Sequence, residues 1–432
     1  MKDKEIQKLI REEEKRQKET LNLIASENYI SKDVCEALGS VFTNKYAEGY
    51  PSARYYAGNA IVDKLEKLTQ SRALKLFIRR PADRRKWSVN VQPYSGSPAN
   101  LAVLHALVPK GEKIMGMALD MGGHLTHGYP ASVTGKLWKQ VPYGVDEGTE
   151  TIDYNALVKL AKKEKPKLII AGGSAYSRII DFKKFRKIAD AVRAPLLVDM
   201  SHFAGLVAGG VYPSPFLYAD VVTTTTHKTL RGPRAAIIFA RKLQISSAKS
   251  QINSNNRNFK SKRQTIAEAI DRSVFPGLQG GPHLNTIAGI AVALEEARKP
   301  AFKKYATQVI RNTRVFSDEL TRLGWRIISN GTDTHLFLVD TAVNGVGGKT
   351  ASDILEKAGI VTNKNIIPYD VRKPSDPSGI RIGTAALTTR GAKEKDMKQI
   401  ARLMNGILSG GIKTTTVEKE VRSIISHFSF FL

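Results

Sequence analysis

The chain has 432 residues, 42% of them hydrophobic, so it is long enough for one large α/β domain with an apolar core and a smaller domain. Its one cysteine, Cys35, excludes an intrachain disulfide and a cysteine-cluster metal site; we expect no metal centre and a reducing compartment, the cytoplasm. No stretch approaches the roughly 20 apolar residues of a membrane span, and the charged N-terminus lacks the apolar core of a signal peptide. We expect a soluble protein without membrane contact.

The formal charge of +27 is large, and an excess of this size often marks proteins that bind nucleic acid or anionic surfaces. The basic residues concentrate at 79–86 and at 241–263, and the second segment contains no Asp or Glu. Neither segment has the interleaved aromatic residues of a single-strand binding platform or a recognisable helix-turn-helix. The pattern favours solvated basic loops and no specific nucleic-acid partner, and a positive field that draws in anionic substrates stays open.

In chain order, the first 30 residues predict a charged helix and then an irregular stretch, an arm of the kind that packs on a partner subunit. From 31 to 282, short apolar strands alternate with helical segments. The clearest elements are strands at 167–171, 196–199, 221–226 and 235–240 and a helix at 182–192. This repetition predicts an α/β fold, with a mainly parallel sheet that helices cover on both faces.

A glycine-rich segment at 276–282 ends this pattern, and a long helical stretch over 284–323 follows it. The remainder predicts a smaller α/β unit, with strands at 336–339 and 380–382 and helices at 350–357 and 394–408. We therefore divide the chain into an arm (1–30), a large domain (31–282), a small domain (283–410) and a tail (411–432). The apolar end of that tail, 428–432, matches none of these patterns.

Lys228 follows a β-branched run, 221–226, that is typical of a buried strand. A second apolar strand ends in Asp199, and open α/β sheets bind their ligands at such strand ends. Pyridoxal phosphate needs this pair, a lysine for the Schiff base and a carboxylate that keeps the ring nitrogen protonated. Taken alone, Lys228 is explained equally well by a surface salt bridge, because strand ends often carry charge.

Two further segments carry polar residues and glycines that core packing does not require. Residues 94–100 place hydroxyls and free amides before a helical run at 101–107, which suits a phosphate, although an ordinary helix cap explains them as well. The loop 122–128 contains His124 and His127. A loop histidine is usually just exposed, but its ring can also stack on an aromatic cofactor.

Segments along most of the chain share their order and spacing with one known family. They read NLIASEN, TNKYAEGYP, RYYAGN, NVQPYSGSPAN, GGHLTHG, VDMSHFAGL, VVTTTTHKTLRGPR, FPGLQGGP, TDTHLFLVD, NKN and SGIRIGT, and they span about residues 20–410. The chain resembles the serine hydroxymethyltransferases, which are pyridoxal-phosphate enzymes of one-carbon metabolism. The resemblance implies the aspartate-aminotransferase-like fold, fold type I of these enzymes, with a smaller C-terminal α/β domain.

The resemblance also implies an activity and partners. The enzyme would transfer the hydroxymethyl carbon of serine reversibly to tetrahydrofolate, giving glycine and 5,10-methylenetetrahydrofolate. It would be a homodimer with shared active sites, and whether two dimers form a tetramer stays open.

By the same resemblance, Lys228 would bind pyridoxal 5'-phosphate covalently and Asp199 would hold the proton on its ring nitrogen. His124 would stack on the ring. The other cofactor contacts would come from Ser95, Gly96, Ser97, Ser174 and His202, with Gly280 and Gly281 from a neighbouring subunit.

Substrate contacts follow in the same way. Arg381 would bind the substrate carboxylate, because its planar fork matches a carboxylate better than a lysine does. Glu48 would be the acid/base carboxylate, although an exposed loop glutamate is the simpler interpretation without the resemblance. The remaining catalytic and amino-acid-pocket positions would be Ser26, Tyr46, Tyr56, His202 and His227.

The folate site implied by the resemblance is a loop beneath the pterin with one polar residue at its edge. Its residues would be Leu119, Gly123, His124, Leu125 and Asn365. Ser375 stands where relatives commonly carry phenylalanine, which predicts looser packing of the pterin and leaves folate against a modified pterin open.

Two other functions are alternatives to the transferase. A folate-independent threonine or allo-threonine aldolase of the same fold is the nearest rival. A basic nucleic-acid-binding protein on an inactive enzyme scaffold is the second, and the intact set of catalytic positions argues against it.

Overall fold

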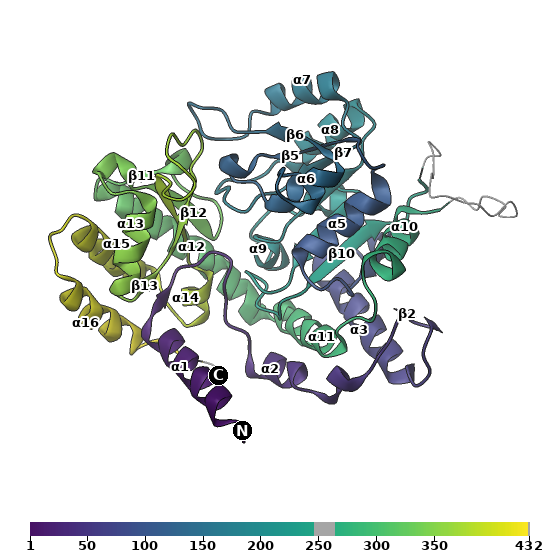
Figure 1. Cartoon of the computed structure of the whole chain (residues 1–432), viewed down its shortest axis with the longest axis horizontal. Helices are drawn as coiled ribbons and strands as arrows, with labels where there is room; N and C mark the ends of the chain where they lie inside the picture. The colour runs from purple at the N-terminus through teal and green to yellow at the C-terminus, as the bar shows by residue number, and fades with distance from the viewer. Residues whose placement is uncertain (246–263, 431–432) are drawn as a thin grey trace, which may run out of the picture.

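The computed structural model describes residues 1–245 and 264–430. Most of the basic segment predicted at 241–263 and the last two residues of the apolar end therefore lie outside the described residues. In Figure 1 most strands belong to a large sheet and a small sheet, each covered by helices, and two further pairs of short strands lie apart from them.

The large sheet has seven strands in the order β4-β10-β9-β8-β7-β5-β6. Only β10 runs antiparallel to its neighbours, and the other pairs are parallel. The strands are β4 (Trp87–Asn90), β5 (Lys113–Met117), β6 (Lys139–Tyr143), β7 (Leu168–Ala171), β8 (Leu196–Asp199), β9 (Val221–Thr225) and β10 (Ala236–Arg241). The predicted fold class, a mainly parallel sheet within an α/β fold, is confirmed.

Helices bury both faces of this sheet. In β7, Leu168 and Ile170 belong to one apolar core, whereas Ile169 and Ala171 belong to the other. Side chains alternate along a strand, so a strand that is covered on both sides is apolar throughout. One face packs on α5 (Gly96–Leu107) and α10 (Ile266–Arg272), and the other on α3 (Ala60–Phe77), α7 (Tyr154–Glu164), α8 (Phe182–Ala191), α9 (Ala204–Ala208) and α11 (Leu284–Arg298).

The small sheet is antiparallel, in the order β11-β12-β15-β14. Its strands are β11 (Arg326–Ile327), β12 (Leu336–Asp340), β14 (Asn363–Asn365) and β15 (Gly379–Gly383). Its helices are α12 (Pro300–Arg322), α13 (Gly348–Lys357), α14 (Ala385–Thr389) and α15 (Glu394–Leu408). Together they enclose a second core that is separate from the core of the large sheet.

The helical stretch predicted over 284–323 is divided into two helices. Lys299 is extended (φ −73°, ψ 148°) and Pro300 begins α12. A proline disfavours helical backbone in the residue before it and has no N–H to continue the first helix. The break lets α12 contribute Tyr305 to the large core and Phe316 to the small one.

Both ends of the chain pack on the small core. After α1 (Lys4–Glu19), strand β1 (Leu21–Asn22) pairs with β13 (Ile360–Val361), and the tail forms α16 (Thr414–Ile425). Arg390, only 2% exposed, donates hydrogen bonds to backbone carbonyls of both ends. The carbonyls belong to Gln17, Lys18, Thr20 and Ser429.

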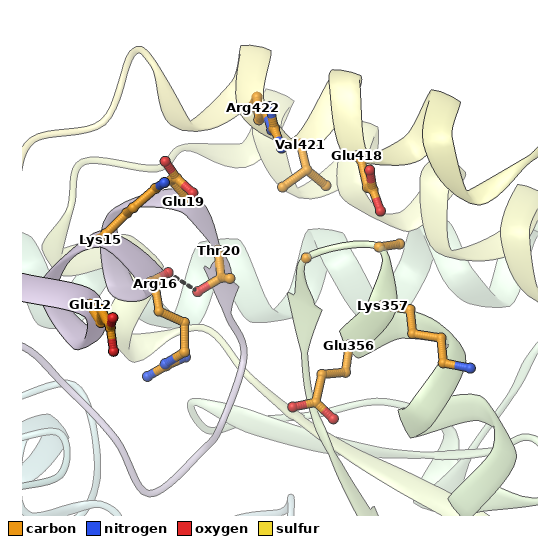
Figure 2. Close-up of a pocket in the computed structure, with 12 residues that line it drawn as sticks. Glu12, Lys15, Arg16, Glu19, Thr20, Glu356, Lys357, Glu418, Val421 and Arg422 are labelled. Carbon is orange, nitrogen blue, oxygen red and sulfur yellow. Dashed lines mark hydrogen bonds between the residues drawn. The ribbon is translucent and has the colours of Figure 1, made fainter. Parts of the chain in front are cut away.

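A surface groove lies between α1, the turn after α13, and α16 (Figure 2). The charged residues that line it are Glu12, Lys15, Arg16, Glu19, Glu356, Lys357, Glu418 and Arg422. These are four acids and four bases, so the groove has no net charge to select an ion, and it contains none of the predicted site residues. No helix within the described ranges is both long and apolar enough to cross a membrane.

Replacing Arg390 by methionine should lower the free energy of unfolding by about 2–4 kcal/mol, because the buried carbonyls of both chain ends lose their donor. Urea unfolding at fixed protein concentration measures this. The control is Arg402→Met: its side chain is 62% exposed in a pair with Glu319, and its loss should cost about 0–1 kcal/mol. Equal losses in the two variants would contradict the role given to Arg390.

Candidate active site

Asp199 and Lys228 meet at the carboxyl ends of two adjacent strands. Strand β8 pairs in parallel with β9, so that Asp199 lies opposite Thr223, and Lys228 follows in the turn after β9. The Lys228 Nζ donates to Thr225 Oγ1 at 3.0 Å. Both residues line one cavity, whose other lining residues are Gly96, Asn100, His124, His127, Gly173, Ser174, Ser201, His202 and Thr225.

The Asp199 carboxylate is buried and fully hydrogen-bonded. Its Oδ2 accepts from Asn100 Nδ2 at 2.8 Å and from His127 Nε2 at 3.1 Å, and its Oδ1 accepts from the Ser201 hydroxyl at 2.6 Å. Burial acts to raise the pKa of Asp199, but the donors and the nearby histidines outweigh it and hold the pKa well below its usual range. The cavity therefore contains a permanent negative charge opposite a lysine.

The start of α5 provides backbone donors at the edge of the same cavity. The helix predicted from Leu101 begins at Gly96, so Ser95 is the residue before the first turn and makes no side-chain cap. The first amides of a helix have no partner within it and favour an anion. Gly96 is packed against β9, since a Cβ there would lie 2.7 Å from Thr225 Cγ2, whereas Ser97 is exposed.

His124 is a neutral ring at the cavity wall. Its Nδ1 accepts from the Thr126 backbone N–H at 3.2 Å and lies 2.7 Å from the Thr126 hydroxyl. Burial is the main reason that its pKa falls to about 4, and the neighbouring His127 lowers it further. An uncharged imidazole in this position can lie against an aromatic ring without carrying a charge into the cavity.

His202 is buried beside a second histidine. Its Nδ1 lies 3.3 Å from Nε2 of His335, a residue of the small domain, and burial lowers the pKa of both rings, that of His335 to about 3. His227, next to Lys228, is partly buried, which lowers its pKa to about 3. All three rings are therefore neutral near pH 7.

Arg381 reaches the cavity region from the small sheet. Its Nη1 donates to the Ser174 carbonyl at 2.9 Å and its Nε to Asn363 Oδ1 at 3.2 Å, and burial lowers its pKa to about 10. Among the ion pairs of the described residues, none involves Arg381. Ala25, the residue before Ser26, packs on the same strand, because a Cβ at Gly383 would be 2.7 Å from that of Ala25. The guanidinium is thus available to a carboxylate from outside the chain.

Tyr46, Glu48, Tyr56, Gly280 and Gly281 form a second group. The two tyrosine rings meet edge to face at 5.1 Å, and a Cβ at Gly280 would lie 3.1 Å from Glu48 Oε1. None of the five lines the cavity around Lys228. The predicted site residues are therefore divided within one chain, and Tyr46 and Tyr56 remain about half exposed.

A buried guanidinium holds the backbone on both sides of Glu48. Arg54 Nη1 donates to the carbonyls of Ala47 at 3.0 Å and Gly49 at 2.7 Å, and its Nη2 binds Glu66 at 2.6 Å. The hairpin of β2 (Gly49–Tyr50) and β3 (Ala53–Arg54) presents this segment at the edge of the large domain (Figure 1). Glu48 thus has a rigid support although it is only partly buried.

The residues predicted to bind folate come from two places. Leu119, Gly123, His124 and Leu125 belong to the loop after β5, in which Leu125 is 48% exposed. Asn365 lies on β14, opposite Gly379 of β15, and Asn363 of the same strand lies opposite Arg381. The Asn365 side chain donates to the Ile366 carbonyl at 2.6 Å.

Comparison with known proteins identifies the family. A family model described as serine hydroxymethyltransferase matches residues 1–404. The chain is 52% identical over 398 residues to a serine hydroxymethyltransferase of Koribacter versatilis, covering 92% of this chain and 87% of that protein. It is 49% identical over 417 residues to one of Acidothermus cellulolyticus, with 96% and 90% covered. The chain belongs to the serine hydroxymethyltransferase family. The resemblance drawn from its motifs is confirmed.

Several residues in or next to the cavity have no role assigned to them by the sequence. Asn100, His127 and Ser201 hold Asp199, His335 contacts His202, and Asn363 contacts Arg381. Each lies inside a motif already quoted, and all but His335 lie within a few residues of a predicted site residue. Nearness in the sequence to a predicted site residue could have indicated these residues, but it does not show which neighbours point into the site.

The amine of Lys228 should be unusually reactive. Burial is the main cause that lowers its pKa from 10.5 to about 8; Asp199 opposes this shift, and the charges of Arg381 and Arg234 add to it. Only the neutral amine is a nucleophile, so labelling by an amine-directed reagent should rise with pH and level off above about 8. Peptide mass spectrometry of cofactor-free protein measures it. Lys349, whose pKa is raised by Asp353, is the internal control, and a common midpoint for both would contradict the assignment.

Proposed function

We propose that this protein transfers the hydroxymethyl carbon of serine reversibly to tetrahydrofolate, giving glycine and 5,10-methylenetetrahydrofolate, with pyridoxal 5'-phosphate bound to Lys228. One observation carries the proposal: an anionic, fully hydrogen-bonded Asp199 and a lysine of lowered pKa line one cavity. The chain is also about half identical to proteins named serine hydroxymethyltransferase. An aldolase that works without folate is not favoured, because those relatives carry the transferase name.

The residues around the cavity fit the cofactor in charge and kind. Asp199 offers a carboxylate for a protonated ring nitrogen, and His124 offers a neutral ring for stacking. Ser95, Gly96 and Ser97 offer the amides of a helix start for the phosphate, and Ser174 and His202 lie along the same cavity. When bound, pyridoxal phosphate supplies an electron-accepting ring that stabilises the charge left on the substrate Cα.

The chain's own groups divide the remaining work. Arg381, free of acidic partners in the described part of the chain, would bind the substrate carboxylate with two parallel hydrogen bonds. Ser26 and His202 would complete that pocket. Lys228 would hold the cofactor and then give way to the substrate amine, and its lowered pKa leaves a larger fraction of its amine neutral than an ordinary lysine has.

Glu48 would move the proton of the substrate hydroxyl, as a positioned acid and base. Because the Glu48 group does not line the Lys228 cavity of its own chain, we infer that it serves the cavity of a second copy. Exposed apolar side chains on the same segments support a homodimer at this face. They are Val41, Tyr55, Ile61, Leu68 and Leu278. Gly280 and Gly281 would contact the cofactor phosphate in the partner's cavity. Glu48, with Tyr46 and Tyr56 on either side of it, would enter the same cavity.

Tetrahydrofolate would lie against the loop of Leu119, Gly123, His124 and Leu125, with Asn365 at its polar edge. This loop includes His124, which would stack on the cofactor ring, so the acceptor and that ring would lie side by side. His227, neutral and adjacent to Lys228, would influence which amino acids react. We also infer a reducing compartment such as the cytoplasm, from the one free cysteine, Cys35.

The purified protein should convert serine to glycine, and added tetrahydrofolate should raise that rate strongly, whereas cleavage of allo-threonine should not depend on it. Glycine formation from labelled serine, with and without tetrahydrofolate or a modified pterin, measures this. A rate on serine that ignores every pterin carrier would favour the aldolase and sink the transferase assignment.

Two inactive variants should restore activity when they share a dimer. Lys228→Arg cannot form the covalent link because a guanidinium stays protonated, and Glu48→Gln cannot transfer a proton. In a hybrid dimer, one site would combine the intact lysine of one chain with the intact glutamate of the other. Random reassortment of differently tagged subunits should therefore recover about a quarter of the sites. Hybrids that form but stay inactive would place Glu48 in its own chain's site.

A further inference from the structure

Asn28 sits in the arm and uses all of its hydrogen-bonding capacity. Its Nδ2 donates to the Lys228 carbonyl at 3.0 Å and to the Tyr305 hydroxyl at 2.8 Å. Its Oδ1 accepts from the backbone N–H of Tyr29 at 2.9 Å and from the Thr389 hydroxyl at 2.6 Å. An amide with two donors and two acceptor positions all engaged has one stable orientation.

These contacts join three separate parts of the chain at the lysine turn. Tyr305 lies on α12, Thr389 ends α14 in the small domain, and both are only 8% exposed. The Tyr305 hydroxyl also lies 3.3 Å from the carbonyl of Thr229, the residue after Lys228. The small domain therefore contacts the backbone of the lysine turn in two ways, through Asn28 at the Lys228 carbonyl and directly through Tyr305 at the Thr229 carbonyl.

We propose that Asn28 is a positioning residue that sets the backbone of Lys228 and so the direction from which its amine reaches the cofactor. This inference rests on the role proposed for Lys228. The lysine turn has an internal bond, from the Arg231 N–H to the Lys228 carbonyl at 3.1 Å, and Asn28 adds the external one. A displacement of about 1 Å at a reacting group can lower a rate roughly 100-fold, so the backbone anchor matters although Asn28 touches no reacting atom.

Asn28→Asp keeps the shape of the side chain but replaces the Nδ2 donor by an oxygen that faces the Lys228 carbonyl. Thr389→Val removes the hydroxyl that orients the amide, without adding a charge, and Thr389→Ser retains that hydroxyl. Asn285→Asp is the matched control: Asn285, also partly buried, donates its Nδ2 to the Leu38 carbonyl at 2.8 Å and lies outside the cavity.

The measurement uses each holoenzyme and follows the absorbance band of the lysine-bound cofactor on dilution, which yields the dissociation constant of pyridoxal phosphate. Borohydride reduction and peptide mass spectrometry locate the linkage at Lys228. Asn28→Asp and Thr389→Val should weaken cofactor binding about tenfold or more and shift the band, because the Lys228 carbonyl loses one of its two donors or that donor loses its orientation. Asn285→Asp and Thr389→Ser should match the unaltered protein.

The outcomes separate the two proposals. If the unaltered protein captures no cofactor at Lys228, the proposed function fails and not only the role of Asn28. If it does, and Asn28→Asp binds cofactor as tightly as Asn285→Asp, the positioning role is overturned. Should circular dichroism show that Asn28→Asp does not fold, the comparison of Thr389→Val with Thr389→Ser decides, and equal affinities in that pair overturn the inference.

Discussion

The site depends on one constraint, which is that a carboxylate must remain charged inside the protein. Burial alone would favour a protonated Asp199, and an uncompensated charge there would be very costly. Asn100, His127 and Ser201 stabilise the charge by donating hydrogen bonds to the Asp199 carboxylate from three different segments. The large sheet makes this arrangement possible, because β8 and β9 end side by side and Lys228 therefore lies opposite the Asp199 carboxylate.

The two domains contribute different chemistry to the cavity. The large domain holds the acid, the lysine and the start of α5, whereas Arg381 and His335 of the small domain contact the lining residues Ser174 and His202. The arm joins them, since its β1 completes the small domain and Asn28 then contacts the lysine turn. The relative placement of the domains thus sets the distance between the lysine and the group that would bind the substrate carboxylate.

The separation of the Glu48 group from the Lys228 cavity suggests a role for the exposed face of the large domain, which is contact with a second subunit. Arg54 and Glu66 hold the segment around Glu48 rigidly, yet Tyr46 and Tyr56 remain half exposed and surrounding apolar side chains face outward. A surface loop with such firm internal support is suited to insertion into another subunit. The proposed dimer would therefore complete the active site and bury an apolar surface in the same step.

Much of this molecule could be predicted from local patterns. The strands around 196–199 and 221–226 follow from apolar and β-branched runs, and parallel pairing brings their ends, with Asp199 and Lys228, to one edge. The family and the fold class were likewise readable from motifs. Other features depend on contacts between segments that are distant in the sequence, and local sequence patterns do not predict such contacts. The donors around Asp199, the contact of Asn28 with Lys228 and the separation of Glu48 from the cavity are of this kind. At Lys299 the helical spacing of apolar residues continues through Pro300, but the proline keeps the residue before it out of the helical conformation, so the helix breaks there.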